Sequence, residues 1–195
     1  MRNKDCFKLS TGFCVILAMM LLTLPLKWLI SAIIAAVYHE LCHILAVRLC
    51  HGEIHRLDLS ADGAKLNISA ISPGRELICA LAGPLGGLIP LFFSRLIPRI
   101  AICAAFQSFY NLLPIYPLDG GRALWCGMSM AISEDRAKQF CRGVETVCLA
   151  AIILAAIYGA FILKLGISCL FPAILILGHV KNRKTPCKQR LQRLQ

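Results

Sequence analysis

Two histidines and a glutamate, His39, Glu40 and His43, have the types and spacing of residues that bind and use a metal ion. They form the pattern H-E-x-x-H inside an apolar run from Trp28 to Cys50. If this run is a helix, the two imidazoles project from one face, one turn apart, and can share one Zn²⁺. Glu40 would lie beside the ion, where a carboxylate can accept a proton from an activated water. The motif predicts hydrolytic zinc chemistry, and its alternative is a chance match in an ordinary helix.

The apolar surroundings favour the metal site over a chance match. A helix of roughly 20 apolar residues is long enough to cross a bilayer. Glu and His are costly in hydrocarbon and seldom occur there without a function. We therefore expect residues 39–43 to lie in a transmembrane helix and to bind zinc.

The composition is that of a membrane protein. Of 195 residues, 58% are hydrophobic, and the mean hydropathy is +0.71, well above the values of soluble domains. The formal net charge is +11, which raises the question of nucleic-acid binding. Most Lys and Arg residues flank apolar runs, however, and this favours anchoring at an anionic cytoplasmic leaflet. We predict a single integral membrane domain, 1–195, with no nucleic-acid partner.

Eleven cysteines are scattered through the chain, mostly in apolar runs and without a C-x-x-C pair. A disulfide framework needs a small secreted fold with regular spacing. We interpret the cysteines, including Cys42 inside the motif, as small packing residues in a reducing or lipid environment.

Hydropathy predicts an all-α polytopic membrane protein with about six transmembrane helices. Between the second and third spans, residues 51–69 alternate apolar and polar side chains around a turn signal, which predicts a β-hairpin at the membrane surface. His51 and His55 in this segment are better explained as solvated side chains than as a second metal site. Residues 134–142 are polar and expected at the interface. The predicted spans are 12–24, 28–50, 71–96, 100–113, 144–163 and 167–180.

The distribution of basic residues predicts the orientation. Six spans place both termini on one side, and the basic tail 181–195 favours a cytoplasmic location for that side. The hairpin 51–69 and the loop after Asp119 then also face the cytoplasm. We expect a multi-pass protein of the cell membrane with the active-site opening on the cytoplasmic side, at the depth shared by the H-E-x-x-H motif and Asp119.

A third zinc ligand is needed, because a catalytic zinc usually has three protein ligands and one open position. Prolines and glycines in the segment Asn111–Arg122 indicate irregular backbone near membrane depth. Asp119 lies in this segment, and a buried carboxylate is costly there unless it is paired or bound to a metal. It is the candidate third ligand. The alternative is an ordinary turn aspartate preceding two glycines.

These two motifs together resemble the site-2 protease family of intramembrane zinc metalloproteases. That family combines an H-E-x-x-H helix with a later N-x-x-P-x-x-P-L-D-G-G segment, which is complete here from Asn111 to Gly121. The stretch Ala82–Pro84 resembles the family's middle core helix, so the resemblance covers a three-helix catalytic core, residues 28–122. It is strongest to the compact sporulation stage IV FB type, whose active site faces the cytoplasm.

The resemblance implies a role for each matching residue. His39, His43 and Asp119 would bind one zinc ion per chain, and Glu40 would be the catalytic base. Asn111 would hold the substrate backbone or stabilise the oxyanion. The residues expected to shape the loop around Asp119 are Pro114, Pro117, Gly120 and Gly121.

The sequence departs from the family at two points. Many members have an Asn three residues after the Gly-Pro of the middle helix, where this chain has Gly87. Many also carry a PDZ or cystathionine-β-synthase-type domain, and we expect neither here, which leaves regulation and substrate delivery open.

The function that we predict is zinc-dependent intramembrane endopeptidase activity on membrane-associated protein substrates, such as a sporulation or transcription-factor precursor. The expected partners are the lipid bilayer, the substrate, and either a regulatory membrane protein or further copies of the chain. The alternative is a non-proteolytic membrane protein that binds or transports metal with the same ligands. Glu40 distinguishes the two, because transport needs ligands but no base.

Overall fold

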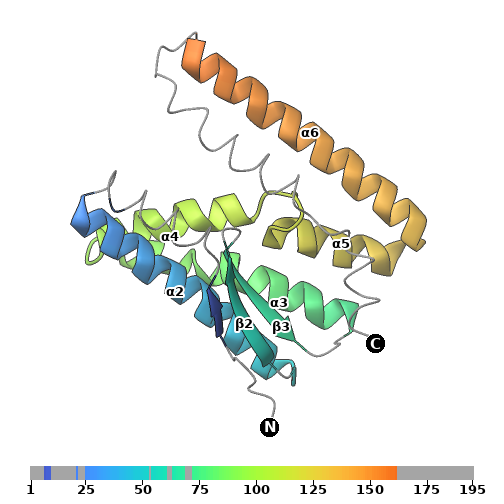
Figure 1. The fold of residues 1–195 in the computed structure, drawn as a ribbon, viewed down its shortest axis with the longest axis horizontal. Coiled ribbons are helices and arrows are strands. Elements are labelled where there is room, and N and C mark those ends of the chain that lie inside the picture. Colours follow the sequence, from blue (N-terminus) through green and yellow to red (C-terminus); the bar gives the residue numbers. More distant parts are fainter. Residues whose placement is uncertain are drawn as a thin grey trace. The chain divides into compact units, whose positions relative to one another are not determined.

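The computed structural model describes residues 7–9, 21, 25–52, 54–60, 63–68 and 72–161 of the 195-residue chain (Figure 1). The chain divides into two compact units, Met1–Asn111 and Leu112–Gln195. The first unit contains helices α2, α3 and α4 and three short strands, and the second contains helices α5 and α6. Because two compact units can belong to one domain, the prediction of a single domain for 1–195 stays a prediction.

Helix α2 (Leu26–Leu49) contains the H-E-x-x-H motif and confirms the helix expected from the apolar run. It begins after Pro25, and near its start the Ser31 hydroxyl donates a hydrogen bond to the Lys27 carbonyl at 2.8 Å. At its end, His51 has a positive φ of 56°. The N–H groups of His51 and Gly52 donate back to the carbonyls of Arg48 and Val47, which is the hydrogen-bond pattern of a Schellman motif. His51 therefore has a structural role, in ending α2.

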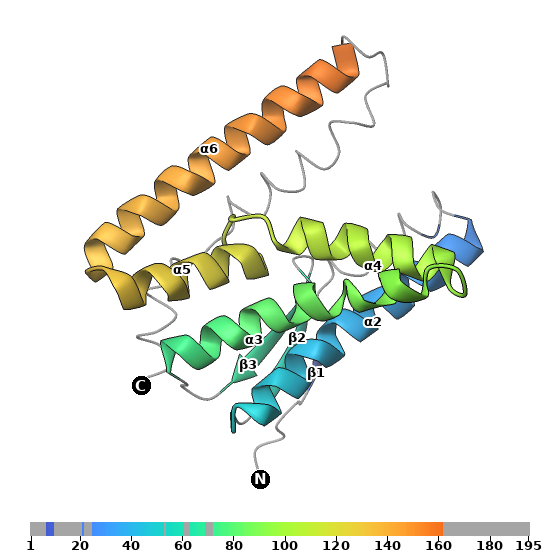
Figure 2. The ribbon, with the colours of Figure 1, turned by 180° about the vertical axis from the view of Figure 1, so that it is seen from behind.

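Helix α3 (Pro73–Gly86) packs against both α2 and α4 (Pro98–Asn111), as Figure 2 shows. Small residues permit this close approach. A Cβ added at Gly87, directly after α3, would collide with the hydroxyl of Ser108 on α4. Ser108 is fully buried, and its hydroxyl has no hydrogen-bond partner within the described ranges. The pair Gly87 and Ser108 thus fixes how closely α3 and α4 approach each other.

Gly87→Ala should destabilise the protein by about 1–3 kcal/mol, because the added methyl group overpacks the contact with Ser108. The additional change Ser108→Ala removes the clashing hydroxyl and should recover most of the loss. Gly127→Ala is the control, because a Cβ there meets nothing within 4 Å. Thermal unfolding in detergent measures all four proteins. A Gly87→Ala variant as stable as the wild type would show that α3 and α4 are not closely packed at this point.

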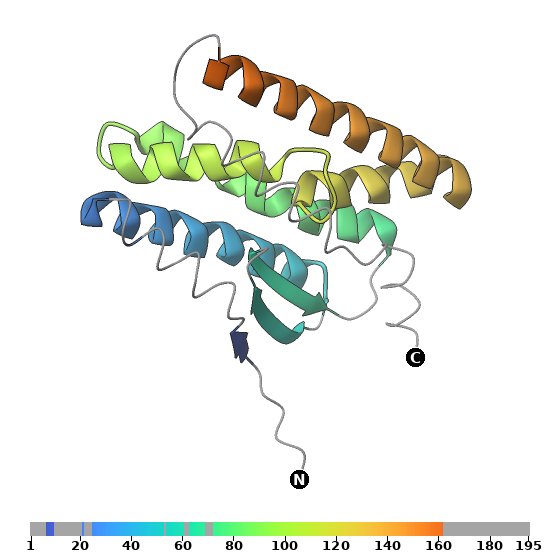
Figure 3. The ribbon, with the colours of Figure 1, turned by 45° about the horizontal axis from the view of Figure 1, so that its top comes forward.

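Three strands form a small sheet in the first unit, with the order β1-β2-β3 (Figure 3). Strands β2 (Ile54–Ser60) and β3 (Gly63–Ile68) are antiparallel and fall within the segment 51–69, for which the sequence predicts a hairpin. Strand β1 (Phe7–Leu9) pairs with β2 in parallel. No pattern in the sequence predicts β1, so the prediction of an all-α chain with only a hairpin omits this strand.

The prediction of irregular backbone as far as Arg122 is wrong at its C-terminal end. The irregular stretch is 112–118, and helix α5 (Asp119–Ala131) begins at Asp119 itself. Gly120 and Gly121 lie in the first turn of α5, where an added Cβ would collide with the backbone of Leu112–Leu113 and of Ile115–Tyr116 respectively. The two glycines therefore allow α5 to start directly against the preceding loop.

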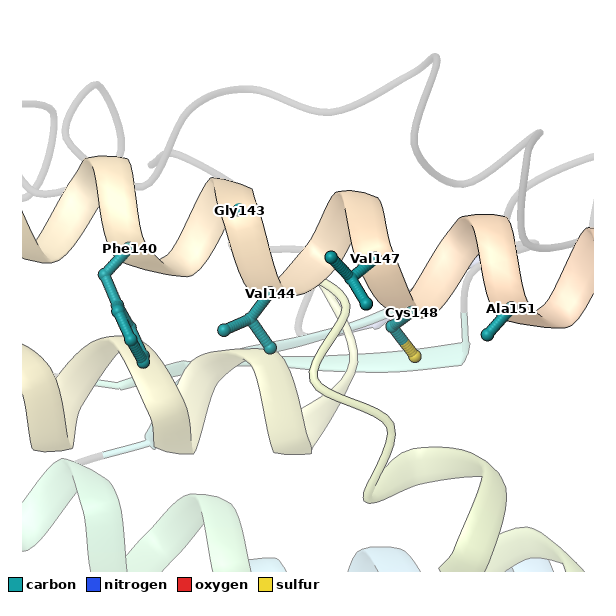
Figure 4. A pocket seen from close by; sticks show the side chains of 6 residues that line it. All are labelled: Phe140, Gly143, Val144, Val147, Cys148 and Ala151. Atoms are coloured by element: carbon teal, nitrogen blue, oxygen red, sulfur yellow. The ribbon is translucent and has the colours of Figure 1, made fainter.

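Helix α6 (Glu134–Phe161) follows α5 and packs against it. It starts ten residues before the expected span, because the polar residues 134–142 belong to the same helix. A wholly apolar groove of about 510 Å³ runs along one side of α6 (Figure 4). All of its lining residues come from this helix: Phe140, Gly143, Val144, Val147, Cys148 and Ala151. Because it contains no His, Asp or Glu, it is not a candidate catalytic site.

Three of the described segments are long and apolar enough to cross a membrane: Leu26–Leu49, Pro73–Phe93 and Glu134–Gly159. The second combines α3 with the 3-10 helix η1 (Ile89–Phe93). Helix α4, predicted as a span, has only 14 residues, fewer than the roughly 20 that cross a bilayer. The expected spans 12–24 and 167–180, like the basic tail 181–195, lie outside the described residues apart from Leu21.

Candidate metal centre

Helix α2 buries His39 and His43 and aligns their imidazoles. The residues are 2% and 6% exposed, although most side chains on the outer faces of α2 are exposed and apolar. Their ring centroids are 4.8 Å apart, and the rings are nearly perpendicular, at 81°. The two Nε2 atoms are 3.2 Å apart. The i, i+4 spacing of the motif therefore brings two nitrogen ligands to one point inside the first unit.

This separation fits a shared zinc ion. Two nitrogens bound to a tetrahedral Zn²⁺ at about 2.0–2.1 Å are about 3.3–3.4 Å apart. The observed Nε2–Nε2 distance of 3.2 Å is close to that value. Two nitrogen lone pairs this close repel each other unless a proton or a cation lies between them. The donor set thus fits a divalent cation that accepts imidazole ligands.

The tautomer of His43 follows from its other ring nitrogen. Nδ1 lies 2.7 Å from the carbonyl oxygen of Cys79 on α3. Because a carbonyl only accepts hydrogen bonds, Nδ1 must carry the proton and donate it. In the neutral ring, Nε2 then keeps its lone pair for a metal. Sequence reasoning missed this partner, because a backbone carbonyl has no residue signature.

Asn111, the last residue of α4, lies beside the two histidines. Its amide Nδ2 is 3.4 Å from Nε2 of His39. The Asn111 amide is therefore within reach of the point where the imidazoles converge, and it is partly exposed. This is the position that an oxyanion donor or a substrate-binding group would need, although Asn111 and His39 are 72 residues apart.

Glu40 follows His39 on α2 and is partly buried. Consecutive residues of a helix are about 100° apart around the axis, so Glu40 lies beside the face that carries the imidazoles. A carboxylate in that position is available for proton transfer next to a metal without being one of its ligands.

Asp119 belongs to the second unit. It is the first residue of α5, and its side chain is 13% exposed. Its Oδ1 atom is 3.7 Å from Nη1 of Arg122, one turn further along the helix. A carboxylate in the first turn is also stabilised by the helix dipole.

The other expected site residues lie in the loop before Asp119. Pro114 and Pro117 are both partly buried, and the Tyr116–Pro117 peptide bond is cis. The N–H of Ile115 donates to the carbonyl of Leu113 at 2.7 Å, so the loop turns tightly around Pro114. The first unit thus brings together His39, His43 and Asn111, and the second holds Asp119 and its loop.

Comparison with proteins of known structure identifies the fold. A site-2 protease from Methanocaldococcus jannaschii has a similar structure, with a TM-score of 0.61 and 20% sequence identity. The match covers 92% of this chain and 92% of the chain of that protease. This chain has the fold of that protease. The arrangement of α2, α3 and α4 around the H-E-x-x-H motif is therefore a site-2 protease fold, as the sequence resemblance implied.

A curated relative matches part of the chain. A protein of Mesorhizobium japonicum that bears the name "Putative zinc metalloprotease" is 33% identical over 95 residues. The match covers 46% of this chain but only 25% of the relative, so the chain spans about a quarter of that protein. No protein-family model matches the chain.

Proposed function

We propose that this protein is a zinc-dependent intramembrane endopeptidase that cleaves membrane-associated protein substrates within or near the bilayer. The observation that carries the proposal is the buried pair of imidazoles on α2, with Nε2 atoms 3.2 Å apart. This pair lies on a helix long enough to cross a membrane, with Glu40 directly beside it. The site-2 protease fold and the name of the curated relative support the same activity.

The proposed ligands are His39, His43 and Asp119, with one Zn²⁺ per chain. His39 and His43 lie together in the first unit, and Asp119 is the carboxylate that the motif segment 111–121 would supply. Two imidazoles and one carboxylate are a common ligand set of catalytic zinc, and they leave a fourth position for water or substrate. When bound, the ion would act as a Lewis acid that polarises the scissile carbonyl and lowers the pKa of a water molecule.

Glu40 and Asn111 would carry the remaining steps. Glu40 accepts a proton from the attacking water and later returns it to the amine of the leaving fragment. Asn111 donates a hydrogen bond from its amide to the oxyanion that develops on the substrate carbonyl. Both roles agree with the positions of these residues beside the imidazole pair.

The small sheet offers a way to hold an unwound substrate. A peptide bond in a helix is hydrogen-bonded and shielded, so a transmembrane substrate must open locally before cleavage. Strand β2 is paired on both sides, with β1 and with β3, whereas β3 has a single partner in the described part of the chain. We propose that an extended substrate segment adds to the outer edge of β3, where main-chain hydrogen bonds would hold it independently of its sequence.

A metal-binding or transport protein is the second candidate, and it is less well supported. Ligands alone would serve that function, and a base beside the ion would have no purpose in it. The combination of Glu40, the His pair and Asn111 corresponds to the requirements of hydrolysis.

The sporulation stage IV FB type remains the proposed subtype, with a sporulation or transcription-factor precursor as the proposed substrate. A regulatory membrane protein or other copies of the chain are the proposed partners. The compact six-span layout predicted from the sequence is the basis of this subtype assignment.

The orientation that we propose places both termini, the hairpin 51–69 and the opening of the active site in the cytoplasm. Two variants test this orientation, Gly63→Cys in the hairpin and Lys184→Cys in the tail, each in a background without the eleven native cysteines. Neither cysteine should react with an impermeant maleimide on intact cells. Lys27→Cys, on the predicted outer side, is the positive control. Labelling at position 184 from outside would overturn the orientation.

Co-expression with candidate membrane substrates tests the proposed activity. Tagged substrates should give shorter fragments with the wild type, and cutting should stop when zinc is chelated from membranes and resume when zinc is restored. A non-catalytic metal protein would give no metal-dependent fragment from any substrate. The alternative function would then be favoured.

A further inference from the structure

Helix α3 contacts the metal ligand His43 at two points, and both contacts involve backbone. The carbonyl of Cys79 accepts the Nδ1 proton of His43 at 2.7 Å. One turn later, Gly83 faces the same imidazole. A Cβ at Gly83 would lie inside the contact distance of three ring atoms, Nε2, Cε1 and Cδ2. The ring therefore packs on the bare backbone of α3, with one edge held by a hydrogen bond.

These contacts fix two properties of the ring that metal binding requires. The hydrogen bond selects the tautomer with the proton on Nδ1, so that Nε2 is the nitrogen directed at His39. The missing side chain of Gly83 leaves the space that the ring occupies in this orientation, and a Cβ there would displace the ring. Outer contacts of this kind orient metal ligands and raise their basicity.

The next turn of α3 shows that close packing alone does not explain Gly83. Gly86 also faces α2, but there an added Cβ would meet Cys42, which the motif does not use. Both glycines allow α2 and α3 to approach each other. Gly83 and the Cys79 carbonyl, by contrast, contact His43, a residue of the proposed metal centre.

We propose that α3 positions the metal ligand. In this account, which rests on the proposed zinc site, the Cys79 carbonyl and Gly83 hold His43 in the metal-binding tautomer and orientation before the ion arrives. Residue 83 then determines metal affinity, although it offers no ligand atom. The group of Cys79 that contacts His43 is its backbone carbonyl.

Metal titration of the purified protein in detergent tests this role. Co²⁺ serves as the probe, because its visible absorption reports both affinity and coordination geometry. Gly83→Ala should weaken Co²⁺ binding by a factor of about 10–100 and change the spectrum, because the ring must turn or shift. Gly86→Ala, which adds the same methyl group one turn away, should keep wild-type affinity and spectrum.

Two results of the titration would overturn the proposal. One is wild-type Co²⁺ affinity and spectrum in Gly83→Ala. The other is an equal loss in Gly83→Ala and Gly86→Ala, which would indicate general damage to the packing of α2 and α3 and no particular role for residue 83.

A second measurement needs no substitution at position 83 and no bound metal. In metal-free protein labelled with ¹⁵N-histidine, the His43 signals, assigned by their loss in His43→Asn, should show a protonated Nδ1 and an unprotonated Nε2. A predominant Nε2–H tautomer would contradict the proposal. A protein that binds no Co²⁺ would refute the proposed zinc function, whereas the tautomer would still decide the role of α3.

Discussion

Glu40→Gln should reduce substrate cleavage by a factor of about 10² or more while zinc remains bound. Glutamine has the size of glutamate and keeps the packing of α2, but it cannot accept a proton from water. The two imidazoles stay in place, because Glu40 is not a ligand in this account. The rate of fragment formation and the zinc content of the same purified sample measure both halves of the prediction.

Glu134→Gln is the control, since this exposed glutamate starts α6 and has no proposed role in catalysis. It should cleave at the wild-type rate. Normal cleavage by Glu40→Gln would show that another group accepts the proton. Loss of zinc from Glu40→Gln would instead place Glu40 among the ligands.

Asp119→Asn should lower both zinc affinity and the cleavage rate, each by at least a factor of about 10–100. Losing an outer hydrogen-bond partner of a metal ligand already has an effect of this size, and losing a ligand itself should cost at least as much. The substitution replaces an anionic ligand with a neutral, weaker one. It also removes the charge that faces Arg122 at 3.7 Å. The fold should persist, because a first-turn position of a helix accepts Asn, and expression should remain normal. Zinc titration and cleavage measure the two losses.

Asp135→Asn provides a matched control, because Asp135 is also in the first turn of a helix and is exposed. It should leave both zinc affinity and cleavage unchanged. If Asp119→Asn kept full zinc content and full cleavage, Asp119 would not be a zinc ligand. Its role would then be limited to the start of α5, and the third ligand would have to be another group.

The centre of the first unit could be predicted from sequence because its signals are carried by side-chain types at helical spacing. The apolar run gives α2, and the i, i+4 spacing of His39 and His43 gives the imidazole pair. Asn111 could be placed near them only through the family motif. Its contact with His39 spans 72 residues, and no local pattern encodes it.

Other parts of the structure depend on interactions that leave no local pattern. The glycines at 120 and 121 suggest a turn, yet they lie in α5 because the preceding loop packs on their bare backbone. Strand β1 is only three residues long, and its Phe7 pairs with Leu57, which is 50 residues further along the sequence. The partner of His43 is a backbone carbonyl, which any residue type could supply. Tertiary contacts determine all three features.

X-ray absorption of the zinc in the purified wild-type protein tests the central claim most directly. The account predicts nitrogen and oxygen neighbours at about 2.0–2.2 Å, with the scattering pattern of two imidazoles and no sulfur neighbour. Sulfur is a meaningful alternative here, because Cys42 is next to His43 and is a free thiol. A zinc–sulfur distance of about 2.3 Å, or a purified protein that binds no zinc, would contradict a centre built from His39, His43 and Asp119.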